Sequence, residues 1–495
     1  MKNKTIPFLF ILLFPTLCCA EETETTFQFL QKFHQDPKHM MERLPSIVDE
    51  NNIAHTRGYI DRNDLEWQRV VKSRIDARER IFTDTSLNVL SAATAPMTTQ
   101  LVEPGPILNN PLSMEQQHLT KALISPTPWA DSYWPIYQGL AAARYADPNA
   151  PRSSSWNANF AYFQSNPPET ALGSTDKKEI DQLSPAEKYD ILLGDMSFSL
   201  TNYSWGLGEY YMRTNQEIPT WMGICHGWAG ASSMNMPIPK KPNVFQSVSG
   251  QSVTLYPADI KALESMLWAN AIKPNRVQGT RCNQVNPAVD AHGRIIDPAC
   301  FDVSPSDWHE AVVNQVGIYQ RSFVMDGDYD IQVWNYPIVS YSYRYFNPQS
   351  WQQAASLAGA IIPISSFTVD KFSQYRSPQA KYIVGIEMDV SYVIEIQPTV
   401  YEILTPPTKT VRYMYDLELD ADQNIIGTGE WYQNAHPDFL WTFDKDTQAH
   451  APEDNEISND VWDTSTPVPS SWTRRAQAAS SRGIPLQSFL GKVNQ

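Results

Sequence analysis

A cysteine flanked by glycines offers the clearest chemistry in the sequence. Cys225 stands in TWMGICHGWAG (220–230), and the small residues that follow it are able to continue a helix. A cysteine in the first turn of a helix meets the positive end of the helix dipole and unpaired backbone amides, which favour a thiolate and stabilise an oxyanion. We therefore predict that Cys225 is a nucleophile at a helix N-terminus; the alternative is a buried, unreactive thiol.

The cysteine count supports a free thiol at this position. Two of the five cysteines, Cys18 and Cys19, lie in an N-terminal segment that we predict to be removed. An exported chain pairs its cysteines where it can, so an odd remainder leaves one unpaired. Cys282 and Cys300 flank a stretch rich in Pro and Asp, and closing that loop would stabilise the fold by roughly 3 kcal/mol. We predict a Cys282–Cys300 disulfide and a free Cys225.

A thiol nucleophile needs a base, which in cysteine acyl-transfer sites comes from a later part of the chain. His309 opens the first strongly strand-like run, so we predict that it is the base. Asp326 ends the next predicted strand, where its carboxylate would orient the imidazole and steady its charged form. The alternatives for this orienting role are Asp328, Asp330 and Asn335.

Other histidines and possible metal ligands have simpler interpretations. The side chain of His226 would point about 100° away from the thiol around a helix. His292 lies inside the predicted disulfide loop and His436 follows a hairpin, where turn and packing roles explain them. The runs 326–330 and 420–424 resemble fragments of calcium loops but lack the Gly and Glu that such loops need, so we interpret both as turns and leave any metal site unknown.

Periodicity predicts helices before strands along the chain. Ser184, Pro185 and Glu187 form a helix start with a capping box, and a second helix begins at Pro257. Residues 147–178, rich in Pro, Asn and Ser, are predicted to be loop, and 65–90 an amphipathic helix. Alternation predicts antiparallel strands from about 308 onward, with a hairpin turn at 420–424. The strand-like runs are 311–320, 322–326, 331–335, 339–346, 382–396 and 410–420.

Composition and the N-terminus predict an exported protein. Lys2 and Lys4 precede an apolar run and then Ala20, which is the layout of a cleaved signal peptide over residues 1–20, so we expect secreted or periplasmic location. No later run is apolar for long enough to span a bilayer, so we expect no integral membrane span. The net charge of −16 and the absence of a basic stripe exclude nucleic acid as a partner.

Several strings together resemble the transglutaminase elicitor family, namely the oomycete elicitor transglutaminases and their bacterial relatives. They are PWADSYWP (128–135), LSPAEKYD (183–190), WMGICHGWA (221–229), VWN (333–335), IIGTGEW (425–431) and HPDFLW (436–441). The resemblance spans about residues 125–442. It implies protein-glutamine γ-glutamyltransferase activity with Cys225 as nucleophile, protein substrates with accessible Gln and Lys side chains, secretion, an N-terminal region that is removed, and calcium dependence, although the chemistry itself requires no cofactor.

The expected fold class is α+β, with a papain/transglutaminase-like core that carries the nucleophile on a helix N-terminus and the His and Asp on antiparallel strands. We divide the chain into a signal peptide (1–20), an N-terminal helical region or propeptide (21–120), a catalytic α+β domain with a β-rich C-terminal part (121–447) and a polar tail, docked or loose (448–495).

Two rival functions remain open. A cysteine protease or glutamine deamidase would use the same triad with water as the acceptor. A non-catalytic surface-binding protein would leave Cys225 unreactive.

Overall fold

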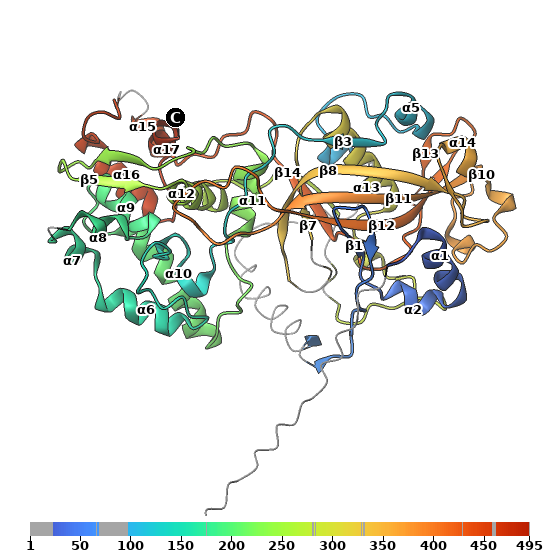
Figure 1. The fold of residues 1–495 in the computed structure, drawn as a ribbon, viewed down its shortest axis with the longest axis horizontal. Coiled ribbons are helices and arrows are strands. Elements are labelled where there is room, and N and C mark those ends of the chain that lie inside the picture. Colours follow the sequence, from blue (N-terminus) through green and yellow to red (C-terminus); the bar gives the residue numbers. More distant parts are fainter. Residues whose placement is uncertain are drawn as a thin grey trace, which may run out of the picture.

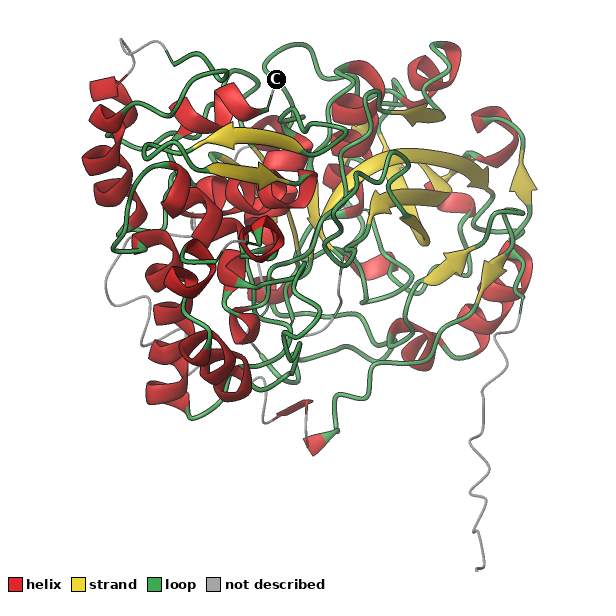
Figure 2. Ribbon diagram, turned by 60° about the vertical axis from the view of Figure 1, so that its left-hand side comes forward, coloured by secondary structure: helices red, strands yellow, loops and turns green. Residues whose placement is uncertain are grey.

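A large antiparallel sheet and a group of helices lie side by side in the molecule (Figure 1; Figure 2). The computed structural model describes residues 23–494 except 66, 69–97, 175, 280–281, 283, 328, 330–331, 428 and 458–461. The predicted signal peptide and most of the predicted helix at 65–90 lie outside the described residues. The α+β class is confirmed, in the form of a mixed fold with a curled antiparallel sheet.

The centre of the sheet consists of three long strands rich in β-branched and aromatic residues. These are β8 (Asn335–Phe346), β11 (Tyr382–Val393) and β12 (Thr408–Leu419), which pair antiparallel as predicted. The strand order is β2-β1-β12-β11-β8-β7-β14-β6. The shorter members are β1 (Ser46–Val48), β2 (Ala54–His55), β6 (Arg276–Gly279), β7 (Val324–Asp326) and β14 (Phe439–Thr442). The predicted turn at 420–424 joins β12 to β13 (Ile425–Ile426).

A one-residue irregularity in β8 decides which side chains share a face of the sheet. Ser391 pairs with Ser340 whereas Tyr392 pairs with Ile338, so Val339 is an extra residue in the ladder. Such a bulge shifts the alternation of side chains between the two faces. Consequently Ile338 and Tyr343 lie on one face, which we call the inner face and which carries the hydrophobic core of the sheet half. Asn335 and Val339 lie on the opposite, outer face.

Different elements cover the two faces. The inner face packs on α13 (Pro305–Ala311) and on the π-helix η5 (Val312–Ile318). On the outer face, α11 (Cys225–Ser233) lies against β7 and β8 near one end of the sheet. The N-terminal helices α1 (Thr26–Gln35) and α2 (Pro37–Met41) pack farther along, where Phe33 and Phe346 both contact Tyr432.

The N-terminal region forms part of the sheet as well as a covering layer. Strand β1 pairs with β12, with Ser46 opposite Arg412, and β2 pairs with β1. The backbone amide of Asn434 donates to Met41, which ties this region to the segment before β14. The removal of the N-terminal region stays a prediction, and these contacts mean that removal would uncover the edge of β12.

The helical half has its own core, in which α11 crosses α12 (Pro257–Asn270). A Cβ on Gly227 would clash with the carbonyl of Ser265, so only glycine permits this close crossing. The other α-helices of this half are α6 (Trp156–Ser165), α7 (Pro168–Leu172), α8 (Lys177–Asp181), α9 (Pro185–Leu192), α10 (Ser199–Asn215), α15 (Asp454–Ile457), α16 (Thr473–Ser480) and α17 (Gln487–Val493). The capping box that Ser184 and Glu187 predict is present at the start of α9.

Four predictions about elements need correction or completion. In the run 331–335, predicted as a strand, only Asn335 is in a strand among the described residues. Residues 147–178, predicted as loop, contain α6, α7 and part of α8. Of residues 311–320, predicted as a strand, those up to Ile318 are helical: the cap Ser304 starts α13, and Val312 and Val316 are fully buried, so tertiary packing outweighs their β preference. The C-terminal tail is docked, with Trp472 and Phe489 in the core of the helical half. Among the described residues, no helix has the length and apolar character needed to cross a membrane.

Candidate active site

Cys225 is the first residue of α11, as the sequence predicts, and its thiol is free. The residue is 6% exposed. The chain before it is held by two backbone contacts: Ile224 N–H donates to the carbonyl of Tyr133 at 2.8 Å, and Gly223 bridges to Pro135. A Cβ at Gly223 would clash with the Tyr133 carbonyl, so this close approach requires glycine. Gly227 N–H in the first turn of α11 donates to the carbonyl of the cap residue Ile224 at 2.9 Å, and by helix geometry the amides of Cys225 and His226 have no carbonyl partner within the helix.

The sulfur contacts the sheet half at the start of β8. The side-chain Nδ2 of Asn335 donates to Cys225 Sγ at 3.3 Å, and the thiol lies 3.7 Å from the carbonyl oxygen of Val333, to which it can donate. On its other side Asn335 accepts through Oδ1 from the indole Nε1–H of Trp441, at 2.8 Å. Asn335 and Trp441 are both 4% exposed, so this chain of contacts is almost shielded from water. The thiol, the amide and the indole therefore form one hydrogen-bonded unit.

Strand register explains why these groups meet. Trp441 is opposite Val324 in the β14–β7 ladder, and Asp326 is opposite Asn335 in the β7–β8 ladder. Paired residues share a face, and so do residues two apart in one strand. All four side chains therefore lie on the outer face, beneath α11.

Asp326 is fully buried at the end of β7. Its Oδ1 accepts the backbone N–H of Trp334 at 3.0 Å, which fixes the segment that contains Val333 beside the sulfur. Trp334 also packs edge-on against Tyr133, at 5.2 Å between ring centroids. Asp326 is thus next to Asn335, as the register requires, and it holds the backbone of Trp334. The alternatives Asp328 and Asp330 lie outside the described residues.

The surroundings of Cys225 favour a neutral resting thiol. Burial raises the pKa of Cys225, and the negative charges of Glu395 and Asp326 raise it further, whereas the donor from Asn335 lowers it. The thiol hydrogen can be given to Val333 while the sulfur accepts from Asn335. Attack on a substrate then requires the proton to move as the bond forms.

The structure does not bring His309 to this site. His309 lies on α13, so the predicted position at a strand entrance is wrong. Its Nδ1 is 2.8 Å from the hydroxyl of Tyr415, and its ring packs on Tyr343, both on the inner face of the sheet. Asn335 and Tyr343 are eight residues apart on β8, which corresponds to roughly 25 Å along the strand. The sheet itself lies between the imidazole and the thiol.

The environment of His309 is that of a core residue. It is fully buried, and burial lowers its pKa to about 3, so the imidazole is neutral. Two other histidines also occupy structural positions: His292 lies in the disulfide loop, and His436 stacks on Trp431 at 4.6 Å between ring centroids. The side chain of His226, which follows the nucleophile directly in the chain, is exposed.

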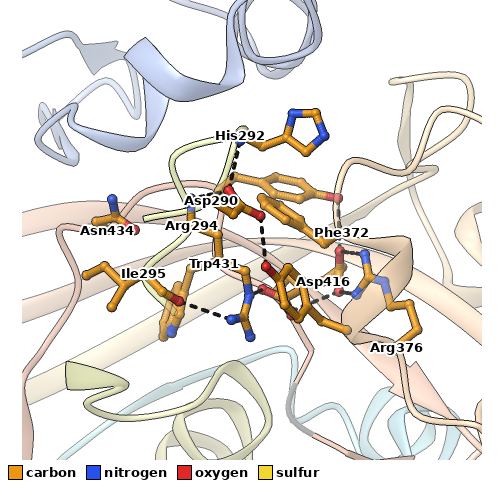
Figure 3. A network of polar contacts seen from close by, with 12 residues as sticks. Asp290, His292, Arg294, Ile295, Phe372, Arg376, Asp416, Trp431 and Asn434 are labelled. Carbon is orange, nitrogen blue, oxygen red and sulfur yellow. Dashed lines mark hydrogen bonds and ion pairs between the residues drawn. The ribbon is translucent and has the colours of Figure 1, made fainter. Parts of the chain in front are cut away.

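The Cys282–Cys300 disulfide is present as predicted, and it closes a loop on the sheet half. Arg294 anchors the loop by an ion pair with Glu430 at 2.6 Å and lies over the ring of Tyr375. Asp290 accepts from the Tyr375 hydroxyl at 3.1 Å. Figure 3 shows Asp290 and Arg294 of this loop beside the Arg376–Asp416 ion pair. These contacts attach the loop to the sheet half.

The acidic runs that resemble calcium loops give no cation site among the described residues. Asp420 accepts the amides of Asp422 and Asn424, as expected for a turn. In the other run Asp328 and Asp330 are outside the described part of the chain. Within that part, no three His, Cys, Asp or Glu side chains gather in a way that suits a metal ion.

A free thiol at the start of a helix, faced by an amide donor, defines a cysteine site suited to carrying an acyl group. The family model described as transglutaminase elicitor matches residues 107–457, which is more than half of the chain. The chain therefore belongs to the transglutaminase elicitor family. The matched region contains Cys225, Asp326, Asn335 and Trp441.

Among solved structures, the GP42 transglutaminase from Phytophthora sojae is similar to this chain. The two are 20% identical, the TM-score is 0.42, and the match covers 76% of this chain and 98% of that chain. Comparison with curated proteins gives no match.

Proposed function

We propose that the protein is a protein-glutamine γ-glutamyltransferase in which Cys225 carries the acyl group. Membership in the transglutaminase elicitor family supports the reaction class. The observation that carries the site assignment is the hydrogen bond from Asn335 Nδ2 to Cys225 Sγ at the start of α11. It is the contact expected of a group that stabilises negative charge as the sulfur reacts.

In the proposed first half-reaction the sulfur of Cys225 attacks the side-chain carbonyl carbon of a substrate glutamine. The C–N bond breaks, a thioester forms and ammonia leaves. We assign the transfer of the proton to Asp326, whose carboxylate lies on the same face as Asn335 and whose charge acts on the thiol. It takes the thiol proton during attack and gives it to the departing nitrogen. No step is assigned to His309.

In the second half-reaction a substrate amine, such as a lysine side chain, attacks the thioester. The amine passes a proton to Asp326, the C–S bond of the thioester breaks as the isopeptide C–N bond forms, and the same proton goes to the departing sulfur of Cys225. The first-turn amides of α11 and the amide of Asn335 are the donors for the oxyanion in both steps.

Water competes with the amine, and a deamidase or protease would use the same thiol. The small exposed fraction of Cys225 and the edge-on pair of Tyr133 and Trp334 support transfer to an amine, because they limit the access of bulk water. The partners that we propose are proteins with accessible Gln and Lys side chains.

Export is also part of the proposal, and calcium dependence remains an expectation from the family resemblance. We propose that residues 1–20 direct the chain to a secreted or periplasmic location. The described residues show no ligand cluster that fits calcium, so we derive no step through that ion.

Incorporation of a fluorescent primary amine into a glutamine-bearing protein tests the function. We expect incorporation by the wild-type protein and none by Cys225→Ala, with ammonia released in proportion. Release of ammonia without incorporation of the amine would identify a deamidase. No reaction together with a native Cys225 that resists iodoacetamide would favour the non-catalytic binding protein.

A further inference from the structure

We propose that Trp441 is a positioning residue that fixes the side-chain amide of Asn335 so that its N–H group faces Cys225. This inference deepens the proposed function, because it assigns a new role at the same thiol. It concerns a residue that lies on the far side of Asn335 and does not hydrogen-bond to the sulfur itself.

The chemistry of the indole decides the orientation of the amide. An asparagine side chain has a donor end and an acceptor end of nearly the same shape, so it can fit a site in two ways. The indole N–H is a donor only, so the atom that faces Trp441 at 2.8 Å must be the amide oxygen. The nitrogen is then left to face the sulfur of Cys225 at 3.3 Å.

The indole is itself held rigidly enough to serve this purpose. Trp441 is part of the β14–β7 ladder, and Phe443 packs against it edge-on at 5.7 Å between ring centroids. A Cβ built on Gly230 of α11 would lie 3.5 Å from the Trp441 ring and 3.1 Å from that of Phe443. The helix that carries the thiol therefore rests on the same ring that orients Asn335.

The reversed amide would have the opposite effect on the reaction. Its carbonyl oxygen would face the sulfur, so the thiolate and the developing oxyanion would meet a partial negative charge in place of a donor. Trp441 prevents this because the reversed amide would also turn its NH₂ group toward the indole N–H, leaving a buried donor against a donor. Trp441 thus acts on the reactivity of Cys225 through Asn335.

The experiment measures the rate at which iodoacetamide alkylates Cys225 as a function of pH, together with kcat and KM for amine incorporation. Trp441→Phe keeps most of the ring volume and removes the N–H. We expect alkylation at pH 7.5 to slow about tenfold, with the midpoint of the pH profile about one unit higher, because a lost donor shifts a thiol by this order. We expect kcat to fall by a similar factor with KM within twofold.

Trp462→Phe is the matched control. Trp462 is also buried and donates its indole N–H to the carbonyl of Thr466, at 3.1 Å, but it belongs to the C-terminal part of the helical half. We expect its pH profile to equal that of the wild type. If both variants have a lower thermal midpoint but neither has a shifted pH profile of alkylation, Trp441 has only a structural role and the proposal is overturned.

Asn335→Asp supplies an independent test should Trp441→Phe not fold. The aspartate keeps an oxygen toward Trp441 and places a second oxygen toward the sulfur, so it imitates the reversed amide. We expect this variant to show the same upward shift of the pH profile. If Cys225 in Asn335→Asp is alkylated with the wild-type pH profile, the role of the amide is refuted. In an Asn335→Ala background, Trp441→Phe should change alkylation less than twofold; a full tenfold effect there would show that Trp441 acts by another route.

Alkylation does not require the transferase reaction. If the alkylation profiles are as predicted but the protein incorporates no amine, the proposed function is rejected and the role of Trp441 stands. If the protein incorporates amine but Trp441→Phe leaves the alkylation profile unchanged, the function stands and the role of Trp441 is rejected.

Discussion

The two faces of the sheet each carry a buried polar group with a displaced pKa, but only one is arranged for chemistry. On the outer face, Cys225 meets a donor amide, a nearby carboxylate and the start of a helix. On the inner face, His309 is fully buried among aromatic rings and contacts the Tyr415 hydroxyl. Burial is the largest cause of both displaced pKa values, so a displaced pKa does not identify a reactive group. The donors and charges that surround the atom do.

The largest expected effect comes from removing the thiol on the outer face. Cys225→Ala should lower amine incorporation by about 10³-fold or more, since the nucleophile forms the acyl intermediate. The fold should persist, because the loss of one buried sulfur leaves only a small cavity. Rates of incorporation and far-UV circular dichroism check both points. Activity within tenfold of wild type would place the nucleophile elsewhere.

Replacing the carboxylate on the same face should have the next largest effect. Asp326→Asn keeps the shape and the acceptor for the Trp334 amide but removes the base, so we expect kcat to fall about 10²-fold with little change in KM. An unchanged kcat would exclude Asp326 from proton transfer and direct attention to Glu395, the other charge that acts on the thiol.

The disulfide should matter for stability and not for the thiol. Cys282→Ser with Cys300→Ser opens a loop with a sequence separation of 18, which should lower the free energy of unfolding by about 3 kcal/mol. Denaturant unfolding measures the loss, and Cys225 alkylation of the folded variant should stay within twofold of wild type. A changed alkylation profile would mean that the loop reaches the outer face.

Burial of His309 on the inner face should make the stability of the fold sensitive to acid. The folded pKa of His309 is about 3, below the unfolded value of about 6.5, so the unfolded chain binds more protons between these values. The contribution of neutral His309 to the free energy of unfolding is fully present above pH 6.5 and is lost as the pH falls toward 3. From pH 6.5 to 5 the wild type should lose about 2 kcal/mol more stability than His309→Phe.

The comparison of the two proteins is needed because other groups oppose this trend. Burial raises the pKa of Asp131, Glu264 and Glu430 to about 7, so their protonation favours the fold as the pH falls. They act equally in the wild type and in His309→Phe, so the difference isolates His309. Equal slopes would show that His309 is accessible and charged.

The sequence predicted the local features of the site well. The helix start at Cys225, the capping box at Ser184 and the Cys282–Cys300 bridge depend on neighbouring residues or on a simple count, and the structure has all three. The long strands β8, β11 and β12 follow from their β-branched and aromatic composition. Each of these features is encoded within a few residues.

The errors concern packing between distant segments. The Val-rich run after His309 resembles a strand, yet the pattern Ser304-Pro305-Ser306-Asp307 caps a helix just as Ser184 does, and this signal could have been read. The bulge at Val339 has no mark in the sequence, although it decides which face each side chain of β8 occupies. Trp441 belongs to the HPDFLW string of the family resemblance, but the sequence assigns it no role, because only the register of β14 places it beside Asn335.

The rate of amine incorporation by folded His309→Phe, compared directly with Asp326→Asn, tests the central claim that catalysis belongs to the outer face. We predict that His309→Phe keeps at least half of the wild-type rate while Asp326→Asn loses about 10²-fold. A folded His309→Phe protein that loses activity a hundredfold, beside an Asp326→Asn protein that keeps it, would contradict this assignment.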